Sequence, residues 1–255
     1  MAKTRKLIVD VLADASRVTS EFAKIGKSSG TLEDKFKKLG KSLALGMGAA
    51  AAGVAVLGKG AIDAAMEAQS VQRKVEAVIK ATGGAANVTG KQVDKLAGSM
   101  SMKVGVDDEV IKAGLSMMLT FKGIRNETGK GNKIFDRAAT AMMDLGSVFG
   151  SSDAAAMQLG KALNDPVKGI GALKKAGVDF TQAQKDQIKK MQESGDLLGA
   201  QKIILGEIEA QVGGTAAASA TAGDKMKVAF GEVQEKIGGA LLPIAEKLRH
   251  GLLRL

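Results

Sequence analysis

Adjacent carboxylates are the most obvious candidate for chemistry in this chain. Asp107, Asp108 and Glu109 stand in a row, and carboxylate oxygens are the ligands that calcium prefers. The spacing of a calcium-binding EF-hand loop is absent, however. The cluster falls at the start of an expected helix, where acidic residues cap backbone N–H groups and oppose the helix dipole. We therefore expect these residues to be structural and expect no metal site.

Other reactive groups are few. The single histidine, His250, has no orienting partner, so a Ser–His–Asp arrangement is not expected. The chain has no cysteine, which excludes thiol nucleophiles and, with one histidine, the usual zinc ligand sets. Gly129-Lys130-Gly131 lacks the Lys-Ser or Lys-Thr that completes a phosphate-binding loop. The sequence predicts no catalytic residue, no cofactor and no enzyme activity.

The charge of the chain points to anionic partners. The net charge is +10, from 37 Lys and Arg against 27 Asp and Glu. A basic surface attracts nucleic acid, anionic lipid or an acidic protein face, and it also serves simply to keep a helix face solvated. There is no Tyr or Trp, and the Phe residues fall on predicted core faces, so stacking platforms for bases are missing. Nucleic acid is not expected as a partner, although purely electrostatic binding to its backbone stays open.

Hydrophobic periodicity predicts an all-α protein, a multi-helix assembly rich in small residues. With 33 Gly, 12 Met and only 3% aromatic residues, the core is built from small and flexible side chains, so its helices can approach closely. Leu7 to Leu12 fits either one short N-terminal strand or the beginning of a helix. We expect a strand or helix arm over 1–30, a long Ala/Gly-rich apolar helix over 31–84, a compact helical domain over 85–214, and a long helix with a tail over 215–255.

An uncharged segment of seventeen residues, Ser42 to Gly58, lies in the Ala/Gly-rich helix. It includes Ala49, Gly53 and Val56, and the first two have the four-residue spacing that lets two helices touch closely. The segment is slightly shorter than the about 20 residues that span a bilayer. Three interpretations remain open: a buried helix contact, a seam between copies of the chain, or a segment that enters a membrane.

The last part of the chain predicts a long helix. Its apolar stripe comprises Met226, Phe230, Val233, Ile237, Leu241 and Ile244. Pro243 should kink or end this helix, because proline has no N–H for the helical ladder.

Residues 159–214 predict three short helices folded back on each other. Asp165 precedes Pro166 as a capping residue before the first helical position. Gly177 and Gly195 are placed to end helices, and Thr181 with Gln184 forms the capping-box pattern.

These residues resemble the N-terminal region of phage tail tape-measure proteins. The resemblance is specific only within 159–243. It rests on Gly160 to Pro166, Gly169 to Leu173, Lys175 to Val178, Phe180, Thr181, Gln184, Lys185, Gly195, Ala200, Gln201, Ile204, Leu205, Gly213, Gly214, Ala216, Ile237, Gly238 and Leu241 to Pro243.

The resemblance implies a virion structural protein of coiled-coil-like helices, made in the host cytoplasm and placed inside the tail tube, where its length sets tail length. It implies major tail protein, tail assembly chaperones and tail-tip proteins as partners, self-association, and contact with the host membrane during infection. Members of the family usually run for many hundreds of residues, so we expect this chain to be an N-terminal region or a truncated prophage form. The alternative is a membrane-active helical protein that uses Ser42 to Gly58 to form pores or penetrate the envelope.

Overall fold

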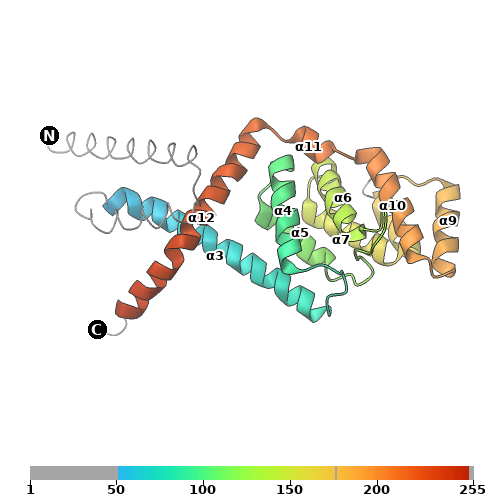
Figure 1. The fold of residues 1–255 in the computed structure, drawn as a ribbon. Coiled ribbons are helices and arrows are strands. Elements are labelled where there is room, and N and C mark those ends of the chain that lie inside the picture. Colours follow the sequence, from blue (N-terminus) through green and yellow to red (C-terminus); the bar gives the residue numbers. More distant parts are fainter. Residues whose placement is uncertain (1–50, 176, 253–255) are drawn as a thin grey trace. The chain divides into compact units, whose positions relative to one another are not determined.

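The computed structural model describes residues 51–175 and 177–252, with side-chain surroundings for 60–175 and 177–243. The described part is helical and contains no strand, which confirms the all-α prediction. Figure 1 shows the helices in chain order. They are α3 (Ala51–Ala81), α4 (Gly90–Val104), α5 (Asp108–Met118), α6 (Ile134–Phe149), α7 (Ser152–Asn164), α8 (Pro166–Lys175), α9 (Gln182–Glu193), α10 (Leu197–Val212), α11 (Thr215–Ser219) and α12 (Ala222–Leu252).

The described residues divide into two compact units. One unit comprises 68–231 and holds α4 to α11 with parts of α3 and α12. The other comprises 51–67 and 232–252. The boundaries fall inside the two longest helices, α3 and α12, and not in a loop.

Helix starts follow the capping residues that the sequence indicates. Thr89 and Thr181 form capping boxes with Gln92 and Gln184, in which each threonine hydroxyl accepts from a backbone N–H and each glutamine accepts from the threonine N–H. Single caps begin three other helices, at Asp107, Ser151 and Asp196. These local bonds satisfy N–H groups that have no partner within the helix. The starts predicted at Asp107 and Thr181 are confirmed.

The core of unit 68–231 forms around α6, which packs on α7, α10 and α11. Phe135 and Met142 of α6 are fully buried, as are Leu159 and Leu163 of α7. Between them lie fully buried alanines, and their small side chains let the helix axes approach closely. These alanines are Ala97, Ala138, Ala139, Ala156, Ala162 and Ala200. The prediction of a core rich in small residues is confirmed for the described residues.

A close helix contact also occurs in the unit formed by 51–67 and 232–252. Gly238 of α12 lies against the carbonyl of Ala61 and the side chain of Ala65, both in α3. A Cβ atom at position 238 would overlap with the Ala61 backbone, so only glycine fits this contact. Leu242, one turn further along α12, is also buried.

The structure corrects two predictions about core faces. Phe149 and Phe230, which the periodicity places on core faces, are 45% and 60% exposed. Met226, in the predicted stripe of α12, is 71% exposed, whereas Val228 is buried. The apolar stripe exists, but its first turns do not face the core. The buried side at the start of the helix carries Val228, and Gly105, the residue that ends α4, lies close to Asp224.

Pro243 does not end α12, which continues to Leu252. Of the two predicted effects, an end of the helix at Pro243 is wrong, and a kink there stays a prediction. A proline removes one hydrogen bond from the helical ladder, and the residues on either side of it, Leu241, Leu242, Ala245 and Glu246, are good helix formers that sustain the rest.

Several expectations concern residues outside the described part. The strand at Leu7 to Leu12 and the residue Ala49 lie there, and of Ser42 to Gly58 only the portion from Ala51 is described, as the start of α3. Gly53 and Val56 belong to that helix. Among the helices of the described residues, none is long and apolar enough to cross a membrane.

A pair of glycines in α8 tests the close packing. Gly169 is buried against the backbone of Ala162 in α7, and a Cβ atom there would overlap with it. We expect Gly169→Ala to lower the free energy of unfolding by about 1–3 kcal/mol, because the two helices must separate. Gly171 in the same helix has nothing within 4 Å of a Cβ position, so Gly171→Ala should stabilise by up to about 1 kcal/mol. Urea unfolding followed by circular dichroism measures both, and equal effects of the two substitutions would contradict the packing.

Candidate functional site at the junctions of helices α7 to α10

The residues that carry the resemblance gather where α7, α8, α9 and α10 join. Gln201 of α10 lies at the centre and is 2% exposed. Its side-chain Nε2 donates to the carbonyl of Leu163 near the end of α7 and to the carbonyl of Gly123 in the loop before α6, both at 2.8 Å. One amide thus satisfies two backbone acceptors that lack a partner in their own elements. Gln201 links three segments that are distant in sequence.

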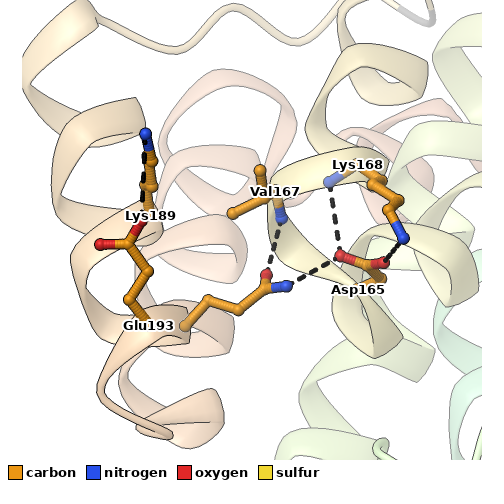
Figure 2. A pocket seen from close by; sticks show the side chains of 6 residues that line it. Asp165, Val167, Lys168, Lys189 and Glu193 are labelled. Carbon is orange, nitrogen blue, oxygen red and sulfur yellow. Dashed lines mark hydrogen bonds and ion pairs between the residues drawn. The ribbon is translucent and has the colours of Figure 1, made fainter.

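A second glutamine holds the junction between α7 and α8. Gln192 of α9 accepts from the N–H of Val167 at 2.9 Å and donates from Nε2 to Oδ1 of Asp165 at 3.0 Å. Figure 2 shows these bonds together with the bonds from Lys168 to Asp165. Asp165 therefore caps α8 as predicted, and Pro166 occupies the first helical position, where its missing N–H costs nothing. Asp165 therefore both caps α8 and binds Gln192 of α9.

These contacts change the acidity of Asp165. The hydrogen bond from Gln192 is the largest cause that lowers the pKa of Asp165 below its ordinary value. Burial acts in the opposite direction, and the hydrogen bonds and charge of Lys168 add to the lowering. The carboxylate form is thus the form that the junction binds.

A third glutamine secures the link between α8 and α9. Gln211 of α10 accepts from the N–H of Asp179 at 3.1 Å and donates to the carbonyl of the same residue at 2.6 Å. Its Nε2 also donates to Glu207, and Glu207 accepts from Gln184 of the α9 capping box. The linker between the helices is therefore fixed to α10 through side-chain amides.

The glycines of the resemblance serve turns and close contacts. Gly160 in α7 lies against the ring of Phe121, and Gly177 lies against the ring of Phe149. Gly177, Gly195 and Gly214 adopt left-handed backbone angles, with φ of +84°, +79° and +82°. These conformations are strained for other residues, which explains the residue type at each turn.

The end of α10 is held by a buried carboxylate. Gly213 ends the helix, and the N–H of Gly214 donates to Oδ2 of Asp144 at 3.0 Å. The N–H of Ala216 donates to Oδ1 of the same side chain, also at 3.0 Å. Asp144 is only 4% exposed, so its carboxylate has lost most of its contact with water. The two backbone N–H groups supply the hydrogen bonds that water would otherwise give.

The carboxylate row at the start of α5 includes the cap of the helix that the sequence predicts. Asp107 caps α5, while Asp108 and Glu109 pair with Lys112 at 2.7 and 3.4 Å. Lys112 also bonds Asp94 of α4 at 2.8 Å. Burial by itself would lower the pKa of Lys112, but the hydrogen bonds to Asp108 and Asp94 outweigh it and raise that pKa above its ordinary value.

A pocket of about 350 Å³ opens between α8 and α9 (Figure 2). It is lined by Asp165, Val167, Lys168, Lys189, Gln192 and Glu193. The polar groups that line it bond to one another, and Lys189 pairs with Glu193 at 3.9 Å. A site with this arrangement can hold two helices together.

Sequence reasoning found some of these residues and missed others. It singled out Gly160, Asp165, Pro166, Gly177, Thr181, Gly195, Gln201, Gly213 and Gly214, and the structure places all of them in α7 to α10 or at the turns between them and before α11. Pro243 belongs to α12. Sequence reasoning missed Gln192, Gln211 and Asp144, because long-range bonds leave no local signal. The signal for Lys112 was present, since Asp108 and Lys112 are four residues apart on one helix.

Comparison of the chain with protein-family models, with curated proteins and with solved structures gave no match.

The bond between Gln192 and Asp165 predicts a change in acidity. In Gln192→Leu the pKa of Asp165 should rise toward its ordinary value, because the largest cause of its lowering is removed. Carbon-detected NMR of the Asp165 carboxyl group during a pH titration measures this pKa. Gln187→Leu, an exposed position on the same helix, is the matched control and should leave the pKa unchanged.

The same substitution also predicts a pH dependence of stability. A carboxyl group whose pKa is lowered by folding stabilises the folded state above its unfolded pKa of about 3.9 and loses this contribution as pH falls through its folded value. The stability difference between the wild type and Gln192→Leu should therefore be larger at neutral pH than at pH 3. A difference that is independent of pH would show that the bond to Asp165 contributes nothing.

Proposed function

We propose that this chain is a structural protein of a phage tail, similar to the N-terminal region of tape-measure proteins, and takes part in tail assembly and in setting tail length. The observation that supports the proposal most is the use of the residues that carry the resemblance. Asp165, Thr181 and Gln201 are engaged in caps and interhelical bonds, and Gly160 and Gly177 in close contacts. Such use suits a protein that acts through its shape and surfaces.

The helical architecture is consistent with such a role. α3 and α12 have 31 residues each, and a helix rises 1.5 Å per residue, so each helix measures about 46 Å. Length in a helix is proportional to residue number, which is the property that a molecular ruler requires. The small residues at helix contacts, such as Gly169 on Ala162, reduce the width of a helix pair. A thin helix pair fits more easily inside a narrow tube.

On this proposal the chain is assembled into the virion tail after synthesis in the host cytoplasm. Its partners would be other copies of the chain, major tail protein, tail assembly chaperones and tail-tip proteins. These partners follow from the family resemblance. The exposed apolar side chains Met226 and Phe230 of α12 are available for such contacts, at 71% and 60% exposure.

Deletion in the encoding genome tests the proposal. Removing residues 159–243 in frame should abolish tails in lysates viewed by negative-stain electron microscopy, and a plasmid copy of the intact chain should restore them. A plasmid copy with Gly171→Ala is the control for the substitution site, because that position is open, and should restore tails equally well.

Two results would contradict the proposal. One is the formation of normal-length tails by the deletion mutant. The other is the absence of the chain from purified tails when their proteins are identified by mass spectrometry.

A further inference from the structure

A rigid basic loop lies between α5 and α6. We call residues 122–133 the basic loop. Asn126 anchors its base with every polar group it has: its N–H donates to the Ala86 carbonyl at 2.9 Å and its carbonyl accepts from the Asn87 side chain at 3.0 Å. Its own side chain donates to Asp136 at 2.7 Å and accepts from the Asp136 N–H at 3.3 Å. Such complete use of one residue fixes the loop to the body of the protein.

The tip of the basic loop is also ordered by internal bonds. The N–H of Glu127 donates to the carbonyl of Asn132 at 3.0 Å, and the Asn132 side chain donates to the Thr128 carbonyl at 2.6 Å. Gly129 and Gly131 turn the chain with positive φ angles. These two glycines also leave the backbone of the tip without bulky side chains on either side of Lys130. A partner surface can therefore approach the tip closely.

The cations of this region are free, whereas its carboxylates are engaged. Lys122, Lys130 and Lys133 are exposed and form no ion pair with any described residue, and neither does Lys202 of α10, next to Gly131. The neighbouring carboxylates all have partners. Glu127 pairs with Arg125 at 2.8 Å and Glu209 with Arg137 at 2.9 Å, so the charges of these pairs cancel. Asp136 accepts from the neutral amide of Asn126 and keeps its negative charge, which is one against the four lysines. The region therefore presents a net positive charge in a fixed geometry.

The chemistry of the loop narrows the class of partner. Protein interfaces need an apolar centre, but the one large apolar residue of the basic loop, Ile124, is fully buried. Membrane insertion would likewise need an exposed apolar or aromatic side chain. The two arginines, which could read guanine edges, are held by Glu127 and Glu209, so only lysines remain free. Lysines contact phosphates as point charges, and contacts to phosphates carry no information about base sequence.

We propose that the basic loop, together with Lys202, binds the phosphate backbone of double-stranded nucleic acid without regard to base sequence. This binding of nucleic acid does not depend on the proposed tail function, and its test is independent of the test of that function. The predicted absence of nucleic acid as a partner rested on the lack of stacking aromatics, and a contact made by lysines alone does not need them.

Fluorescence anisotropy of the full chain with a labelled 24-base-pair duplex tests the proposal. The test variant carries Lys130→Gln, Lys133→Gln and Lys202→Gln. The matched control carries Lys174→Gln, Lys175→Gln and Lys190→Gln, which remove the same charge from exposed, unpaired positions on α8 and α9. Thermal unfolding by circular dichroism confirms that both variants are folded. The wild type should bind two duplexes of different sequence equally.

We expect the test variant to bind about tenfold or more weakly than the control at 0.1 M salt. The slope of log affinity against log salt should decrease by about 2 to 3, because each lysine on a phosphate contributes about 0.9 to that slope. Three results would overturn the proposal: equal binding by test and control variants, no binding of duplex by the wild type at 50 mM salt, or binding of vesicles rich in phosphatidylserine but not of duplex.

Discussion

Unpaired backbone groups at helix ends are the constraint that organises the compact unit of this protein. Short helices expose many such groups for each residue that they order, and buried carbonyls without partners are costly. Gln201 meets this requirement for Leu163 and Gly123 with a single amide group. Gln192, Gln211 and Asp144 do the same at neighbouring junctions. These four polar side chains connect α7 to α11 through bonds that the apolar core does not supply.

Close packing depends on the same arrangement. Gly160 accommodates the ring of Phe121, and Gly169 accommodates the backbone of Ala162, so the helices approach each other with little side chain between them. Contacts of this kind bury few atoms per residue and gain little hydrophobic stabilisation from large side chains. Directional bonds at the junctions then decide which of several close packings forms. The small residues thus allow the helices to approach, and the side-chain amides at the junctions bond their ends together.

Local chemistry in the sequence predicts the elements of the fold well. Capping boxes at Thr89 and Thr181 mark helix starts, and glycines such as Gly177 and Gly195 mark ends, because these bonds and backbone angles involve residues close in sequence. Partners across long separations are invisible to such reasoning. The bond from Gln201 to Gly123 joins residues 78 positions apart. Neither residue type, nor its neighbours in the sequence, indicates that this bond forms. The rotation of α12, which leaves Phe230 exposed, is likewise decided by packing and not by its own periodicity.

The candidate site shows the same division. Sequence reasoning identified the turn residues of 159–214 through their types, and identified the start of α5 at its carboxylates. It did not show that the loop before α6 would leave lysines such as Lys130 without partners, since the pairing of Glu127 and Glu209 with arginines is a property of the folded chain. Charge that is balanced in the sequence can therefore become unbalanced on one part of a surface.

Amide hydrogen exchange of the intact chain tests the role of Gln201 most directly. Comparison of the wild type with Gln201→Met, a substitution of similar volume, measures the opening of each segment. The account predicts that the end of α7, the loop around Gly123 and the start of α10 exchange faster together in the variant, while α4 and α5 keep their protection. Unchanged exchange in all three segments would contradict the claim that this amide holds the junction.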